Sequence, residues 1–282
     1  MWLIFTLVFV LAQIAFLQFF KVAIKDSKNV GAFTVLVQVV ASLSILVLCP
    51  FFGWAWPRGW LVWVLLLVSL GLYAVNDRLD ATVRKNIDIS VDAMVQQVYR
   101  IFFLVMGIAF LGRSFVWLKL LGCVIIIFAN VFLLFDKGKF KINRYVLLKV
   151  LSALIFAAAF TLDTYNSPEF NLPFFVFVSF AVPACCLMLT RQATFRGLVT
   201  EVKRKQWPII VACGVCNGLS AFAILRAYQF YQHFVEVAAV SASYVILNVL
   251  LATVFLRERG NLVQKFIAGA VIVGSIVMIA LV

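Results

Sequence analysis

Long stretches without a charged residue constrain the fold of this chain more than any other feature. Such stretches cover residues 1–20, 29–57, 59–76, 170–190, 206–225 and 237–256. A helix needs about 20 apolar residues to cross the hydrocarbon core of a bilayer. The chain is 65% hydrophobic and only 12% charged, which is too little charge for the surface of a soluble domain. The sequence therefore predicts an all-α integral membrane protein in contact with the lipid bilayer.

A block near the middle of the chain resembles the block at its end. Residues 110–135 read FLGRSFVWLKLLGCVIIIFANVFLLF, and residues 255–282 read FLRERGNLVQKFIAGAVIVGSIVMIALV. Each has Phe-Leu, a short charged turn, a glycine (Gly122 or Gly269) and a final apolar run. Internal repeats with membrane-type hydropathy are typical of secondary transporters, whose substrate site lies between the repeats.

We therefore expect ten transmembrane helices arranged as two inverted five-helix repeats. An odd number of helices in each repeat makes the two repeats point in opposite directions. The first repeat is predicted to span residues 1–135 and the second residues 146–282, with a polar connector at 136–145. The predicted helices are 2–21, 31–52, 59–80, 89–110, 117–135, 146–165, 172–190, 207–229, 233–256 and 262–282.

The basic residues are divided unevenly between the two ends of the predicted helices. The net charge is +13, and 19 lysines and arginines fall in the odd-numbered loops against four in the even-numbered loops. Such residues in short turns act as topology determinants and lipid anchors, so we expect no nucleic acid partner. Because basic loops stay in the cytoplasm, the charge bias predicts that both termini lie outside, in a multi-pass protein of the cell (inner) membrane.

No motif of cofactor, metal or hydrolytic chemistry stands out. The six cysteines include Cys213 and Cys216, but His233 is the single histidine of the chain, and metal sites need more ligands than this pair supplies. The sequence holds no GxxxxGK[ST], HExxH or GxSxG pattern. We therefore expect no catalytic residue, metal or cofactor, and a chain that is not an enzyme.

Two predicted helices carry polar stripes at a depth where lipid would penalise them. Asp92, Gln96 and Arg100 follow one another at intervals of four, so they share a helical face. The equivalent helix of the second repeat carries Glu236, Tyr244 and Asn248, and a shift of 144 places Asp92 on Glu236 and Arg100 on Tyr244. Polar groups inside a membrane usually face a cavity or a partner, so the stripes predict a central substrate site. The substrate-binding candidates are Asp92, Gln96, Arg100, Asn217, Glu236, Tyr244 and Asn248.

Plainer interpretations of the charged members remain open. Asp92 and Glu236 lie near predicted helix starts, where a carboxylate also meets the helix dipole favourably. Either residue is a candidate for proton coupling. One interpretation of Arg100 is an ion pair with Asp92, Asp80 or Glu236. The other is that its guanidinium group binds a carboxylate or phosphate of the substrate with two hydrogen bonds.

The turn segments resemble a known family. FLRERGNLVQKFIAG (255–269) and, more weakly, FLGRSFVWLKLLG (110–122) are similar to the "LGER…Q…G" turn of the drug/metabolite transporter superfamily, specifically its ten-helix EamA-type members. The resemblance implies an alternating-access carrier for a small organic solute, without covalent chemistry. It also implies termini inside the cell, whereas the charge bias predicts termini outside.

These observations predict a secondary active transporter of a small polar or amphiphilic metabolite. Arg100 favours an organic anion or zwitterion, such as an amino acid, as the small-molecule substrate. The alternatives are a nucleotide-sugar or phosphorylated-sugar exchanger and, from another class, a polytopic membrane enzyme or lipid-handling scaffold. Both a monomer and a homodimer are compatible with the sequence.

Overall fold

A computed structural model of the protein places helix in all ten segments that hydropathy predicted. It describes residues 1–99, 101–103, 105–106, 117–133, 135–136, 139–140, 143–191, 193–204, 206–230, 237, 240–241, 243–255 and 262–280. The helices of the first half are α1 (Trp2–Ile24), α2 (Val30–Leu46), α3 (Trp60–Asn86), α4 (Ile89–Gln96) and α6 (Trp117–Leu133). Those of the second half are α7 (Arg144–Asn166), α8 (Leu172–Leu189), α9 (Phe195–Val202), α10 (Trp207–Tyr228), α12 (Tyr244–Phe255) and α13 (Leu262–Ala280).

Six helices of the described residues are long and apolar enough to cross a membrane. They are α1, α3, α8 and α10, together with α2 and α7 counted through the 3₁₀ turns that follow them, Cys49–Phe51 and Ser167–Glu169. Residues Leu262–Met278 of α13 form a shorter apolar helix. The chain is therefore a mainly helical multi-pass protein, and the count of ten spans stays a prediction.

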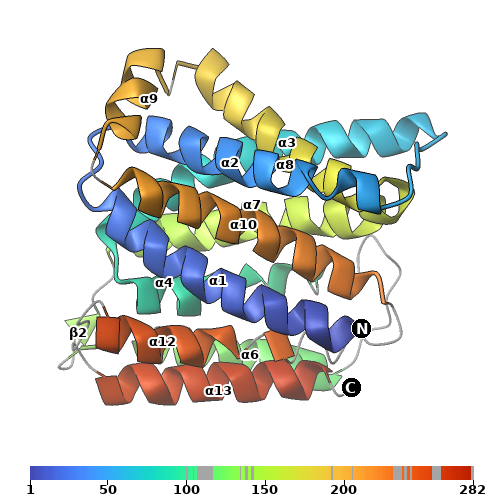
Figure 1. Cartoon of the computed structure of the whole chain (residues 1–282). Helices are drawn as coiled ribbons and strands as arrows, with labels where there is room; N and C mark the ends of the chain where they lie inside the picture. Colours follow the sequence, from blue (N-terminus) through green and yellow to red (C-terminus); the bar gives the residue numbers. More distant parts are fainter. Residues whose placement is uncertain are drawn as a thin grey trace.

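The helices lie side by side with their axes roughly aligned (Figure 1). The start of α1 and the end of α13 lie at the same end of this bundle, and α9 and β2 lie at the opposite end (Figure 1). The first end carries Trp54, Trp56 and Trp63, whose rings stack in sequence with centroids 6.0–6.5 Å apart. Exposed indole rings at a helix end are typical of the membrane–water interface. The opposite end receives the α1–α2 and α9–α10 turns with Lys25, Lys28 and Lys203, so we call it the basic end.

Helices of the first half pack mainly against helices of the second. α1 lies along α10, α3 along α7, α2 along α8, and α6 along α13. The buried apolar side chains between them include Leu17, Phe33, Ile210 and Ile272. Each half therefore buries its apolar surface largely against the other, and the space between the halves is where a site lined by both can form.

Two glycines allow α10 to approach α2 closely. A Cβ added to Gly214 would lie 2.6 Å from Cβ of Val40, and one added to Gly218 would lie 2.7 Å from the carbonyl oxygen of Ala41. Glycines four residues apart on one helical face are a recurrent device for close helix contact in membranes. These glycines therefore allow α10 to pack closely against α2 of the first half.

Three local features differ from the sequence prediction. Helix α3 continues to Asn86 instead of ending at residue 80, because the charges of its last two turns are neutralised by partners inside the protein, as described below. The connector holds a short antiparallel ladder of β1 (Phe135–Asp136) and β2 (Lys139–Phe140), so the described fold is not purely helical. Helix α9, capped by the Thr194 hydroxyl, was not predicted.

Candidate functional site

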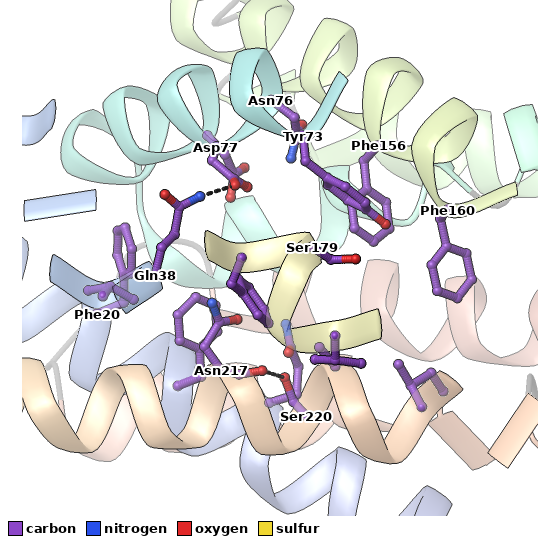
Figure 2. Close-up of a pocket in the computed structure, with 18 of the residues that line it drawn as sticks. Phe20, Gln38, Tyr73, Asn76, Asp77, Phe156, Phe160, Ser179, Asn217 and Ser220 are labelled. Carbon is purple, nitrogen blue, oxygen red and sulfur yellow. Dashed lines mark hydrogen bonds between the residues drawn. The ribbon is translucent and has the colours of Figure 1, made fainter. Parts of the chain in front are cut away.

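A cavity of about 190 Å³ lies between the two halves of the chain (Figure 2). Helices α1, α2, α3 and α4 line it from the first half, and α7, α8 and α10 line it from the second. The polar and charged side chains of its wall are Gln13, Thr34, Gln38, Tyr73, Asn76, Asp77, Asp80, Arg84, Gln96, Tyr99, Asp163, Ser179, Asn217 and Ser220. A wall this polar, inside an otherwise apolar bundle, marks the cavity as the candidate functional site.

Helix α3 supplies one complete face of the cavity. Tyr73, Asn76, Asp77, Asp80 and Arg84 follow the spacing of three and four residues that puts side chains on one helical face. The Gln38 amide of α2 donates a hydrogen bond to the Asp77 carboxylate, and Figure 2 shows this pair at one side of the cavity. Asn76 in turn accepts a hydrogen bond from the Ser152 hydroxyl of α7, 2.8 Å away.

Four charged side chains form ion pairs with one another at the edge of the cavity. Arg84 contacts Asp80 at 2.7 Å and Asp92 at 3.1 Å, while Lys149 contacts Asp92 at 2.7 Å and also binds Asp80. We call these residues the four-charge ring. Two cations and two carboxylates balance each other, which is what makes such deep burial tolerable. The ring joins α3 and α4 of the first half to α7 of the second.

Aromatic side chains form the other part of the wall. The rings of Phe156 and Phe160 on α7 stack with centroids 5.6 Å apart, and Tyr99 meets Phe156 edge-on at 5.2 Å. Asp163 follows one turn later on α7 and is 2% exposed. The hydroxyl groups of Tyr73 and Ser69 lie against its carboxylate. Figure 2 shows Tyr73, Phe156 and Phe160 gathered on the side away from Gln38.

The structure brings two of the predicted site residues to the cavity. Gln96 and Asn217 line it, and Ser220, one turn after Asn217, lines it as well. Asp92 does not line the cavity, because Arg84 and Lys149 hold it in the four-charge ring. It does lie in the first turn of α4, as its position predicted.

Tyr244 and Asn248 lie away from the cavity. Tyr244 is buried and accepts a hydrogen bond from the Gln97 amide at 2.7 Å, and Asn248 accepts one from Gln18 at 2.8 Å. Both join a helix of one half to a helix of the other without lining the cavity. Arg100 and Glu236 lie outside the described residues, so their predicted roles stay predictions.

Residues missed by the sequence analysis include Asp77, Tyr73 and the Phe156–Phe160 pair. The polar periodicity from Tyr73 to Arg84 was a readable signal, but it crossed the predicted helix end at residue 80. The aromatic pair carried no such signal, because phenylalanine occurs 29 times in the chain.

The lining of the two halves follows a matching pattern. A constant shift of 144 relates five lining residues of α3 to five of α10, and a shift of 142 relates three of α2 to three of α8. The α3 set is Tyr73, Asn76, Asp77, Asp80 and Ala81, and the α10 set is Asn217, Ser220, Ala221, Ile224 and Leu225. The charged positions Asp77 and Asp80 correspond to the apolar Ala221 and Ile224. The two sides of the cavity thus share the spacing of their lining residues and differ in charge.

Comparison with known proteins identifies the family. Residues 143–280 match the sequence profile of the EamA-like transporter family. This segment, just under half of the chain, is similar to EamA-like transporters, so the family resemblance inferred from the turn segments is confirmed. With the apolar helices it indicates a multi-pass membrane transporter of small molecules, and the ten-helix detail stays a prediction.

Solved structures share the fold of this EamA-like protein. Twenty-one chains of solved structures match it. One, described only as a crystal structure of a protein, has a TM-score of 0.64 over 98% of this chain and 94% of its own, at 12% sequence identity. Identity this low shows the fold alone. No curated protein matches the sequence. Within the described part of the chain, no group of three histidine, cysteine or acidic side chains is placed to hold a metal.

Proposed function

We propose that this EamA-like chain is a secondary active carrier that moves a small polar or amphiphilic metabolite by alternating access. The observation that carries the proposal is the cavity itself, which holds polar and charged groups inside an apolar bundle and takes its walls from both halves. Substrate sites of repeat-built transporters lie at such an interface. The cavity volume of about 190 Å³ suits a small metabolite.

The proposal includes two inverted five-helix repeats, residues 1–135 and 146–282. The matching spacing of lining residues on α3 and α10, and on α2 and α8, supports it. So does the reciprocal packing, because α1 lies along α10 as α3 lies along α7. In two inverted repeats related by a two-fold axis, α1 corresponds to α7 and α3 corresponds to α10. The α1–α10 pair of helices then corresponds to the α7–α3 pair. The repeats would rock about the cavity to open it on either side.

We further propose the cell (inner) membrane as the location, with the basic end in the cytoplasm. Most of the lysines and arginines among the described residues lie in the turns and helix ends at that end, and such basic segments are retained on the cytoplasmic side. Both termini then face outward, since the start of α1 and the end of α13 lie at the opposite end (Figure 1).

The proposal is tested by solute exchange in liposomes that contain the purified full-length chain. Liposomes loaded with a mixture of amino acids, amines, organic acids and nucleotide sugars are diluted into the same solutes carrying isotopic label. We expect saturable, time-dependent exchange of at least one class, because a carrier returns loaded from either side. Liposomes without protein are the control. Exchange of none of these classes would contradict the carrier, and strict exchange of nucleotide sugars alone would favour the alternative substrate class.

A further inference from the structure

The charge balance of the cavity wall points to the class of substrate. The four-charge ring is neutral as a unit, because Arg84 and Lys149 match Asp80 and Asp92. Two carboxylates of the wall remain outside it, those of Asp77 and Asp163. Among the described residues, no lysine or arginine lies within 4.0 Å of either carboxylate. The described wall is therefore acidic.

Neutral groups surround both carboxylates, and they leave one oxygen of Asp163 without a partner. Asp77 accepts from the Gln38 amide and also lies against the Asn76 side chain. Asp163 is almost wholly buried against the hydroxyls of Tyr73 and Ser69, but Ser69 donates its proton to the carbonyl of Leu66. Atom Oδ1 of Asp163 has no hydrogen-bond partner. A buried carboxylate oxygen without a partner is costly, and a cationic group that enters the cavity would remove that cost.

The surroundings of Asp163 also suit a cation with an apolar body. Phe156 and Phe160 present a stacked pair of rings one to two turns away on α7, and Tyr99 and Tyr73 extend this wall. Aromatic faces attract cations and pack against apolar groups. An anionic substrate would have fewer favourable contacts with the described wall. The guanidinium of Arg84, the described cation of the wall, already binds two carboxylates and lies 5.0 Å from the Phe16 ring centroid.

We propose that the cavity binds an organic cation, an amine with an apolar or aromatic body. Its ammonium group lies against the carboxylates of Asp163 and Asp77, and its apolar part lies on Phe156 and Phe160. The inference rests on the proposed carrier function and names its substrate class. In the sequence, Arg100 suggested an anion or zwitterion as the substrate. The described residues of the cavity wall favour a cation instead.

Three ligands that share a phenylethyl body and differ in charge test this inference. 2-Phenylethylammonium, 3-phenylpropanamide and 3-phenylpropionate are titrated into the purified full-length chain in detergent, with binding measured by calorimetry and protein-free micelles as the blank. We expect the ammonium ion to bind about tenfold or more tightly than the neutral amide, and the carboxylate to bind most weakly. Equal or tighter binding of the amide or the carboxylate, or binding of none of the three, would overturn the inference.

Variants then locate the cationic group. Asp163→Asn keeps the shape and removes the charge, so we expect it to weaken ammonium binding about tenfold or more. Glu169→Gln removes an exposed carboxylate just beyond the same helix and is expected to bind as the native chain does. Unchanged binding by a folded Asp163→Asn chain contradicts the assignment. Should that variant not fold, the ligand series on the native chain decides the question by itself.

Binding and exchange separate the two proposals. Selective binding of 2-phenylethylammonium without exchange in liposomes would support the cation site and contradict the carrier. Exchange of organic acids by a chain that does not bind the amine would support the carrier and overturn the cation site.

Discussion

Replacing Lys149 with methionine is expected to destabilise the folded chain by about 3–5 kcal/mol, the usual cost of breaking a buried ion pair from one side. Lys149 is fully buried, and its ammonium group contacts both carboxylates of the four-charge ring. Methionine preserves the length of the side chain but leaves Asp80 and Asp92 with Arg84 as their common partner. One buried negative charge then has no counterion in the ring. The measurement is the fraction of monodisperse protein that remains after heating in detergent.

A second substitution should recover much of this loss. In Lys149→Met combined with Asp92→Asn, the Asp80–Arg84 pair remains, so the charge is balanced again. Lys28→Met, at an exposed position of the basic end, is the control and should melt as the native chain does. A Lys149→Met chain as stable as the native one, or a double variant less stable than the single one, would contradict the ring as a structural unit.

Placing tryptophan at Ala221 is expected to reduce solute exchange about tenfold or more. Ala221 lines the cavity on α10, at the position that corresponds to Asp77 on α3. An indole group there occupies space that a substrate needs, at an overpacking cost of about 1–3 kcal/mol that should leave the chain folded. Exchange is measured in liposomes for whichever solute the native chain carries.

The same helix offers a matched control. Leu219 is 37% exposed on the outer surface of α10, and Leu219→Trp adds an indole outside the cavity. It is expected to exchange solute at nearly the native rate. Native exchange by Ala221→Trp, or equal loss in both variants, would mean that the cavity is not the route of the solute.

The hydropathy of the sequence predicted where helices lie, because the bilayer imposes length and apolarity on every segment. Asp80 and Arg84 lie one turn apart on α3, at the spacing of a helical ion pair, and the structure shows them bound to each other. Gln96 and Asn217 line the cavity. Their positions at membrane depth suggested this, because polar groups there usually face the interior of the bundle.

Long-range partners explain what the sequence did not show. Asp92 shared a face with a predicted stripe, but Lys149 on α7 binds it, and no spacing rule connects residues 57 positions apart. The same ring neutralises Asp80 and Arg84, so α3 continues past the point where hydropathy placed its end. Asp163 stood at a predicted helix end, and only the packing of α7 against α3 brings it beside Tyr73 in the wall of the cavity.

The central claim, that the cavity opens in turn to both sides of the membrane, is tested most directly by the accessibility of one cysteine. All six native cysteines are replaced by serine or alanine, and Ala221→Cys is then added in the wall of the cavity. A membrane-impermeant maleimide is applied to right-side-out vesicles and, separately, to inside-out vesicles, with the cysteine-free chain as the blank. The account predicts labelling from each side, because each conformation exposes the cavity to one of them. Labelling from one side only, or from neither, would contradict it.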